Sequence, residues 1–226
     1  ELRVVVMSAT LTADLLHGYL RGAAHIEVGT RHHSITVRYQ PGKPSTPVWE
    51  QAGAALKDIM AQEADGDVLI FMPGAYEIQR TIQWCRARKF ARGVSLVPLH
   101  GGLPAGKQDA AMKPSGCRKV IVATNIAETS LTVPGVRHVI DAGLVRMNRY
   151  DPARGTDMLV TEPVCRDAAD QRAGRAGREA PGTCVRLWSQ AVQYRKPAAT
   201  DPEIRRCDLA EPLLQLRAAG WPDPTH

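Results

Sequence analysis

Residues 119–132 read KVIVATNIAETSLT, a short apolar run rich in β-branched side chains followed by small polar ones. The apolar part is continuous rather than alternating, which is typical of a parallel strand buried on both faces. Ligands in open α/β sheets bind beyond the carboxyl ends of the strands, where the polar part would lie. The stretch therefore predicts a buried parallel strand followed by a binding loop.

Similar apolar runs recur along the chain and alternate with helical patterns. This alternation predicts a doubly wound, mostly parallel α/β sheet with helices on both faces. A proline-rich stretch at 40–47 separates off an N-terminal segment, and 144–160 has the pattern of a β-hairpin rather than a crossover. The predicted strands are 4–7, 68–72, 94–99, 119–123, 136–141 and 183–187, and the predicted helices are 48–62, 74–87, 104–112, 167–175 and 209–219.

The composition excludes several classes of protein. Hydrophobic residues make up 44% of the chain and aromatic residues 5%, so the core must be aliphatic. Five scattered cysteines without a CxxC pair indicate neither a disulfide framework nor a zinc site, and they fit a reducing cytosol. No apolar run approaches the roughly 20 residues of a membrane span, so no membrane partner is expected. The net charge of +6 and the pI of about 9.2 favour a polyanionic partner.

Residues 171–178 read QRAGRAGR and form the strongest candidate site. Arginines at every third position would project from one helical face, where like charges repel unless an anion lies between them. Guanidinium groups match phosphate oxygens two at a time, so the expected anion is a phosphate. Gly174 and Gly177 weaken a helix, which fits a bulky group approaching the backbone. The alternative is a solvated basic face of a helix.

A second phosphate-binding pattern is incomplete. Residues 101–107 place a glycine, four residues and a Gly-Lys pair after an apolar strand, as in a Walker A loop. Gln108 stands where that loop needs Ser or Thr for Mg²⁺, and Pro104 removes an amide from the cradle. Lys107 is therefore expected to face solvent in the first turn of a helix. The sequence predicts no complete nucleotide site and no metal site in this chain.

Four separated segments resemble one family in their order and spacing. Residues 7–11 (MSATL) resemble motif III of superfamily-two helicases, and residues 71–74 (FMPG) resemble a turn that DEAH-box helicases use against a nucleic-acid backbone. Residues 124–132 are similar to motif V of DEAH-box proteins, and the octapeptide 171–178 is similar to their motif VI. Residues 151–216 look most like the bacterial HrpB-type DEAH-box helicases. The resemblance covers essentially the whole chain.

The resemblance implies how the chain is divided. DEAH-box helicases close two RecA-like domains over ATP, with RNA running across both. By resemblance, residues 1–40 are the end of the first domain and a linker, residues 41–195 are the second RecA-like domain with a β-hairpin insertion, and residues 196–226 begin a winged-helix domain with a helical segment. ATP and Mg²⁺ would be held mainly by the first domain, whose P-loop and DEAH residues this chain lacks. The start at Glu1 rather than Met fits a piece of a longer protein.

Catalytic roles follow from the resemblance to motif VI. Arg175 and Arg178 match arginine fingers that reach the γ-phosphate held by the other domain. Gln171 matches the glutamine that orients the attacking water or contacts the γ-phosphate. Arg172 is equally consistent with an ATP-coupling role and with a structural ion pair, for which the candidate partners are the neighbouring Asp167 and Asp170.

RNA contacts are implied in the motif that resembles motif V. Thr124, Asn125 and Ser130 are short polar residues beyond a buried strand, and such residues bind phosphate oxygens without reading sequence. The alternative is a local structural role, since Thr124 or Asn125 would make a good helix N-cap.

Further residues that are candidates for RNA contacts come after other predicted strands. Gly74, His100 and Gly101 would let the RNA backbone approach closely, with ordinary turns as the alternative. Trp49 is consistent with stacking on adenine, although a buried aromatic residue at a helix start is the simpler interpretation. The arginines of the predicted hairpin either guide a strand, as in the family, or form a solvated basic rim: Arg146, Arg149 and Arg154.

Nucleotide coupling is implied at three positions. Ser8 and Thr10 match the motif that links the ATP state to domain movement, and the alternative is that they cap a helix beginning near residue 11. Thr132 matches a position that approaches the nucleotide. Two residues further on, the family often has an acidic residue facing the ribose, but this chain has Pro134. A direct ribose contact is therefore not expected there, and nucleotide-base selectivity should be weak.

The sequence therefore predicts the second RecA-like domain of a bacterial, cytoplasmic, ATP-dependent RNA helicase. This domain would supply arginine fingers for ATP hydrolysis and half of a groove that binds single-stranded RNA by its backbone. Its other partners would be the first RecA-like domain and the winged-helix domain of the same protein. Alone, it is expected to bind RNA weakly and to hydrolyse ATP at a background rate. Two alternatives stay open: a DNA translocase domain, and a non-catalytic nucleic-acid-binding module.

Overall fold

The computed structural model describes residues 4–7, 22–24, 26, 33–62, 65–128 and 133–221, in two compact units, 1–31 and 32–226. In the first unit, the described residues form no helix or strand, so the strand predicted at 4–7 is wrong. The side chains from Val4 to Met7 are 49–87% exposed. A strand needs a neighbour to pair its backbone groups, and none of the described residues pairs with this run.

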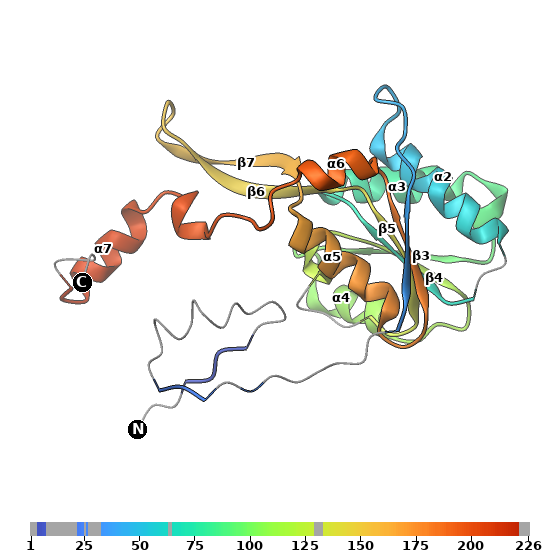
Figure 1. Ribbon diagram of the computed structural model, residues 1–226, viewed down its shortest axis with the longest axis horizontal. Helices are drawn as coiled ribbons and strands as arrows, with labels where there is room; N and C mark the ends of the chain where they lie inside the picture. Colours follow the sequence, from blue (N-terminus) through green and yellow to red (C-terminus); the bar gives the residue numbers. More distant parts are fainter. Residues whose placement is uncertain are drawn as a thin grey trace. The chain divides into compact units, whose positions relative to one another are not determined.

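The second unit is built on a six-stranded sheet in the order β1-β8-β5-β2-β4-β3, in which every pair is parallel (Figure 1). This confirms the predicted doubly wound fold. The strands are β1 (Ile35–Tyr39), β2 (Asp67–Phe71), β3 (Ser95–Leu99), β4 (Lys119–Ala123), β5 (Val136–Asp141) and β8 (Gly182–Arg186).

The edge strand β1 was not predicted from the sequence. Its residues ITVRY lack a continuous apolar run, because an edge strand is open to solvent and three of its five residues are exposed. β1 pairs with β8 from Ile35 opposite Gly182 to Tyr39 opposite Arg186. The sheet therefore begins before residue 41, the predicted start of the second domain, and the domain boundaries themselves stay a prediction.

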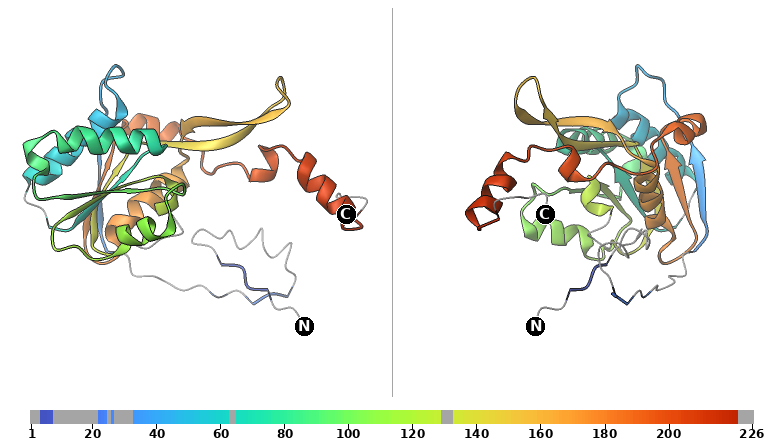
Figure 2. Two further views of the ribbon diagram at one scale, coloured as in Figure 1. Left: turned by 180° about the vertical axis from the view of Figure 1, so that it is seen from behind. Right: turned by 60° about the vertical axis from the view of Figure 1, so that its left-hand side comes forward.

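Helices cover both faces of the sheet, as predicted (Figures 1 and 2). α2 (Val48–Ala61) and α3 (Ala75–Arg86) pack on one face, whereas α4 (Ala105–Met112) and α5 (Arg166–Gly174) pack on the other. A 3-10 turn, η3 (Arg175–Gly177), continues α5. The remaining helical elements are η1 (Lys89–Ala91), η2 (Asn125–Ala127), α6 (Gln190–Arg195), η4 (Glu203–Arg205) and α7 (Ala210–Ala218).

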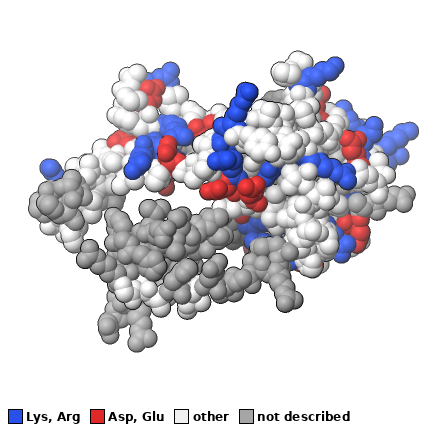
Figure 3. All heavy atoms as spheres, in the orientation of Figure 1, with Lys and Arg blue, Asp and Glu red and all other residues white. Residues whose placement is uncertain are grey.

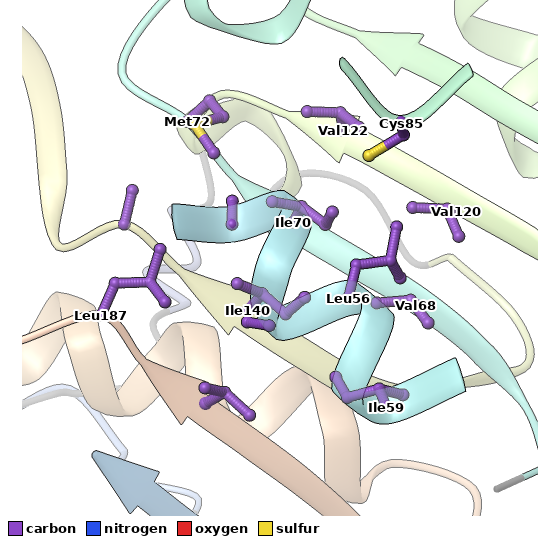
Figure 4. Packing of buried hydrophobic residues seen from close by; sticks show 14 of the residues in the cluster. Leu56, Ile59, Val68, Ile70, Met72, Cys85, Val120, Val122, Ile140 and Leu187 are labelled. Carbon is purple, nitrogen blue, oxygen red and sulfur yellow. The ribbon is translucent and has the colours of Figure 1, made fainter. Parts of the chain in front are cut away.

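The strands alternate between two hydrophobic clusters. In β2, Val68 and Ile70 join the cluster under α2 and α3, whereas Leu69 and Phe71 join the cluster under α4 and α5. Figure 4 shows Leu56 of α2 among the side chains of the first cluster. These four of the five β2 residues are 0% exposed, which explains why their sequence shows no alternation.

The predicted hairpin forms a separate antiparallel sheet of β6 (Leu144–Asp151) and β7 (Thr156–Pro163). Gly155 has φ +64° in its turn, a left-handed conformation that favours glycine. The chain after α6 returns to this hairpin, where the Tyr150 amide donates to the Arg206 carbonyl at 2.7 Å. α7 confirms the predicted helix at 209–219 within one residue at each end and buries none of its side chains. Among the described helices, none has the length and apolar character needed to cross a membrane.

Candidate functional site

The polar residues predicted to follow strands lie at the carboxyl edge of three neighbouring strands, β2, β4 and β3. The backbone links these loops directly, since the Thr124 amide donates to the Leu99 carbonyl at 3.1 Å and the Met72 amide donates to the Ala123 carbonyl at 2.8 Å. This edge, which we call the carboxyl edge, collects Gly74, His100, Gly101, Thr124 and Asn125. Ser130 lies outside the described residues.

Two open positions mark the carboxyl edge. Asn125 and Gly101 are exposed, and a Cβ added at Gly101 would meet no atom within 4 Å. Thr124 and His100 are half-buried. Thr124 occupies the N-cap of η2 but makes no side-chain cap hydrogen bond, so the capping alternative for Thr124 is wrong.

Gly74 differs from this expectation, because it is buried under a part of the same chain. Arg146 from β6 and Glu77 from α3 form an ion pair at 3.5 Å across it. A Cβ added at Gly74 would lie 2.8 Å from Nη1 of Arg146 and 2.9 Å from Oε2 of Glu77. The missing side chain at Gly74 therefore makes room for the ion pair that joins the hairpin to α3.

Arg172 is the buried centre of the octapeptide, with 1% of its side chain exposed. Its Nε donates to Oε2 of Glu128 at 2.9 Å, and its Nη1 donates to Oδ1 of Asp141 at 2.9 Å. Its guanidinium also lies 4.9 Å from the Phe71 ring centroid. The structural ion pair is thus present, but the predicted partners are wrong: Asp170 instead accepts from Nη2 of Arg186 at 2.5 Å.

The charge on Arg172 is stabilised by the two carboxylates. Burial opposes the charged guanidinium, but Asp141 and Glu128 outweigh burial and raise the pKa of Arg172. Asp141 is 0% exposed, and its Oδ1 also accepts from the Gly143 amide at 2.8 Å. The last residue of β5, the loop after β4 and α5 are therefore held together by one charged cluster of Arg172, Asp141 and Glu128.

The other arginines of the octapeptide follow Arg172 at every third position. α5 ends at Gly174, and the 3-10 turn η3 continues the chain from Arg175, which is 5% exposed. Nε of Arg175 donates to the Glu128 carbonyl at 2.9 Å, and its Nη2 donates to the same oxygen. Burial and then repulsion from Arg178 lower the pKa of Arg175 to about 10, so it stays charged at neutral pH. Arg178 is exposed, and Gln171 is half-buried.

Glu128 is the functional candidate that sequence reasoning missed. Its carboxylate binds Arg172 and its carbonyl binds Arg175, while η2 connects it directly to Thr124 and Asn125. It is the only acidic residue in the stretch 124–132, and the octapeptide holds three arginines with no carboxylate of its own. This excess of arginines over acidic residues was the sequence signal that pointed to Glu128, because buried charges in proteins are normally paired.

The glycines of the octapeptide have different surroundings. A Cβ at Gly177 would lie 2.7 Å from the His33 carbonyl oxygen and from Cγ1 of Ile35, so the group that approaches the backbone there is the chain's own β1 segment. A Cβ at Gly174 would meet no atom within 4 Å. Only Gly174 thus leaves room for an external group.

Lys107, at the end of the incomplete Walker A pattern, is exposed in the first turn of α4, which confirms the prediction for this residue. Within the described ranges, His, Cys, Asp and Glu side chains do not gather in groups of three or more that could hold a metal ion. Ser8, Thr10 and Thr132 lie outside the described residues.

Surface charge does not single out one region on the face shown in Figure 3, where basic and acidic side chains are interleaved. The hairpin illustrates this mixing, because Arg149 pairs with Glu162 at 3.0 Å and Arg154 pairs with Asp151 at 3.6 Å. The candidate site is therefore defined by local geometry: the octapeptide and the carboxyl edge, connected through Glu128.

Comparisons with known proteins all match helicases. Residues 51–180 match the model of the helicase conserved C-terminal domain. The chain is 37% identical to the ATP-dependent RNA helicase HrpA of Escherichia coli over 227 residues, covering 99% of this chain and 17% of HrpA. It is 38% identical to the human ATP-dependent RNA helicase DHX33 over 233 residues, covering 98% of this chain and 32% of DHX33.

Solved structures agree with the sequence matches. A crystal structure of the E. coli DEAH/RHA helicase HrpB superimposes with a TM-score of 0.89 at 38% identity, covering 96% of this chain and 28% of HrpB. A crystal structure of the E. coli DExH-box NTPase HrpB gives a TM-score of 0.86 at 38% identity, covering 97% of this chain and 27% of that chain. The chain therefore spans less than a third of the length of these solved relatives.

Proposed function

This chain belongs to the helicase conserved C-terminal domain family, and from that premise we propose that it is the second RecA-like domain of an ATP-dependent DEAH-box RNA helicase. Its role is to supply arginine fingers for ATP hydrolysis and half of an RNA groove. The observation that carries the proposal is the position of Glu128, which bonds Arg172 and Arg175 and follows Thr124 and Asn125 in the same loop.

The octapeptide supplies the groups that phosphoryl transfer needs. Arg175 and Arg178 carry guanidinium groups, which stabilise charge on a transferring phosphoryl group. Gln171 orients the attacking water or contacts the γ-phosphate. Nε and Nη1 of Arg172 donate to the carboxylates of Glu128 and Asp141, so Arg172 acts by positioning Arg175 and the loop at Glu128 rather than by touching ATP. The side-chain amide of Gln171 and the guanidinium groups are hydrogen-bond donors, so they fit a triphosphate, whose oxygens accept hydrogen bonds.

ATP itself is held mainly by the first RecA-like domain of the complete protein. The Mg²⁺ that accompanies ATP neutralises charge on the β- and γ-phosphates, and its usual ligands are carboxylate, phosphate and water oxygens. The described part of this chain gathers no set of carboxylates for it. In this proposal the chain contributes cations to the phosphate, and the other domain contributes the metal ligands.

The carboxyl edge binds single-stranded RNA through its backbone. Exposed Asn125, the half-buried Thr124 side chain and the open surface at Gly101 suit phosphate and sugar contacts, which carry no sequence information. By family resemblance, residues 41–195 with β1 form this RecA-like domain, and residues 196–226 begin a winged-helix domain. The first RecA-like domain and the winged-helix domain of the same protein are the remaining partners.

The test compares this chain with the complete protein. The complete protein is expected to hydrolyse ATP faster when single-stranded RNA is added, and more so than with DNA of equal length. The chain alone is expected to remain at the background rate, because its P-loop-like segment is incomplete. Robust turnover by the chain alone that Lys107→Ala abolishes would overturn the proposal, and equal or greater stimulation by DNA would favour the DNA translocase.

A further inference from the structure

An aromatic cluster lies beside the carboxyl edge and has no role in the function proposed above. Tyr76 is the second residue of α3, which begins directly after Gly74, three residues beyond the end of β2. Its ring centroid lies 5.9 Å from that of Trp49 in the first turn of α2, with the ring planes at 89°. The guanidinium of Arg80, four residues after Tyr76, lies 5.3 Å from the Trp49 ring centroid.

The members of this cluster differ in exposure. Trp49 is half-buried between the starts of α2 and α3, which run side by side (Figures 1 and 2). Tyr76 is 58% exposed, and Arg80 is also exposed. An aromatic ring that served only helix packing would be buried, as Trp49 partly is. Trp49 therefore packs against the Tyr76 ring, and the rest of the Tyr76 side chain is exposed to solvent.

The chemistry of this cluster suits a nucleobase. Every base has a π-face, so bases stack on exposed aromatic rings without regard to sequence, and a neighbouring arginine adds cation–π and phosphate attraction. The chain has only four Trp, five Tyr and two Phe residues, yet Tyr76 and Trp49 meet next to the carboxyl edge. An edge-to-face pair also holds the Tyr76 ring in a defined orientation.

We propose that Tyr76, supported by Trp49 and flanked by Arg80, is a stacking site for one base of the single-stranded RNA that the carboxyl edge binds. This inference rests on the proposed RNA-binding function and adds a contact to the base, whereas the contacts proposed for Thr124 and Asn125 are to the backbone. The Tyr76 site would give affinity for stacked bases and no direct hydrogen-bond readout.

The test uses the complete protein and two probes: a fluorescent single-stranded oligouridine, and an abasic ribose-phosphate oligomer of the same length. Tyr76→Ala is expected to weaken binding of the oligouridine about fivefold to about 100-fold. Binding of the abasic oligomer is expected to change less than about twofold, because that probe offers no base to stack. Tyr76→Phe, which keeps the ring, should retain wild-type affinity for both probes.

The control is Tyr194→Ala, which removes another exposed tyrosine, on α6, and should leave both affinities unchanged. Unchanged oligouridine affinity in Tyr76→Ala would overturn the stacking site, and so would an equal loss for both probes. Either result would point to a protein partner or a fold effect at this surface. If the wild-type protein binds neither probe and RNA does not stimulate its ATPase, the proposed function itself fails.

Discussion

Replacing Arg178 by alanine in the complete protein is expected to lower the rate of ATP hydrolysis by about 10³-fold or more, the range measured for arginine fingers. Arg178 is the exposed arginine of the octapeptide, next to the 3-10 turn that ends α5. Its removal would take away one of the two guanidinium groups that we propose act on the transferring phosphoryl group. The affinity for single-stranded RNA should change less than about twofold. Steady-state ATPase rates and RNA titrations at fixed salt measure the two quantities.

Two further variants sharpen this prediction. Arg178→Lys keeps the charge but loses the planar fork that matches two phosphate oxygens, so its rate should fall between those of alanine and wild type. Arg195→Ala removes an exposed arginine at the end of α6 and should leave the rate unchanged. If ATPase and RNA affinity fall together in Arg178→Ala, the octapeptide binds RNA, and the non-catalytic binding module becomes the better description.

The second large effect is on stability. Arg172→Ala is expected to lower the free energy of unfolding of this chain by about 3–5 kcal/mol, because it leaves Asp141 and Glu128 without their shared cation. Asp141 is fully buried and would lose the hydrogen bond from Nη1 of Arg172. The alanine would also leave a cavity beside Phe71, whose ring the guanidinium covers at 4.9 Å. Urea denaturation followed by circular dichroism measures the loss.

A matched control distinguishes a buried pair from an exposed one. Arg154 pairs with Asp151 at 3.6 Å, but its side chain is 67% exposed, so Arg154→Ala should cost less than about 1 kcal/mol. Arg172→Lys should also destabilise, because an ammonium group cannot reproduce the fork that reaches two carboxylates. A loss below about 1 kcal/mol in Arg172→Ala would mean that the charged cluster does not hold α5 to the sheet.

The central strands and the long helices could be predicted because burial on both faces leaves a direct mark on the sequence. The predicted strands at 119–123 and 136–141 have the observed bounds. β1 could not be predicted, since three of its five residues are exposed and its sequence ITVRY lacks the apolar run that marks β3 at the other edge of the sheet. α6 is only six residues long, and its N-cap Ser189 was its clearest sequence signal.

The candidate site was partly predictable for a different reason. Thr124, Asn125, His100 and Gly101 follow strands, and the carboxyl ends of parallel strands meet at one edge of a sheet. Which carboxylate pairs with Arg172 depends on how distant segments fold together, because Glu128 and Asp141 are 44 and 31 residues away in the chain.

The surroundings of the glycines could not be predicted from the sequence either. A glycine indicates that space is needed but does not identify what occupies it. At Gly74 the neighbour is the ion pair of Arg146 and Glu77, and at Gly177 it is the segment from His33 to Ile35.

We propose that Glu128 connects RNA binding at the carboxyl edge to the arginines of the octapeptide. Glu128→Gln keeps the shape of the side chain and the carbonyl contact with Arg175, but it replaces the ion pair with Arg172 by a hydrogen bond to an uncharged acceptor. Glu162→Gln, at the Arg149 ion pair of the hairpin, is the matched control.

The decisive measurement is the ratio of ATPase rates with and without saturating single-stranded RNA in the complete protein. Glu128→Gln is expected to lower this ratio about fivefold or more, because about 1 kcal/mol of the interaction with Arg172 is lost when its acceptor becomes uncharged, whereas Glu162→Gln should leave the ratio unchanged. A wild-type ratio in Glu128→Gln would mean that Glu128 does not connect the two sites.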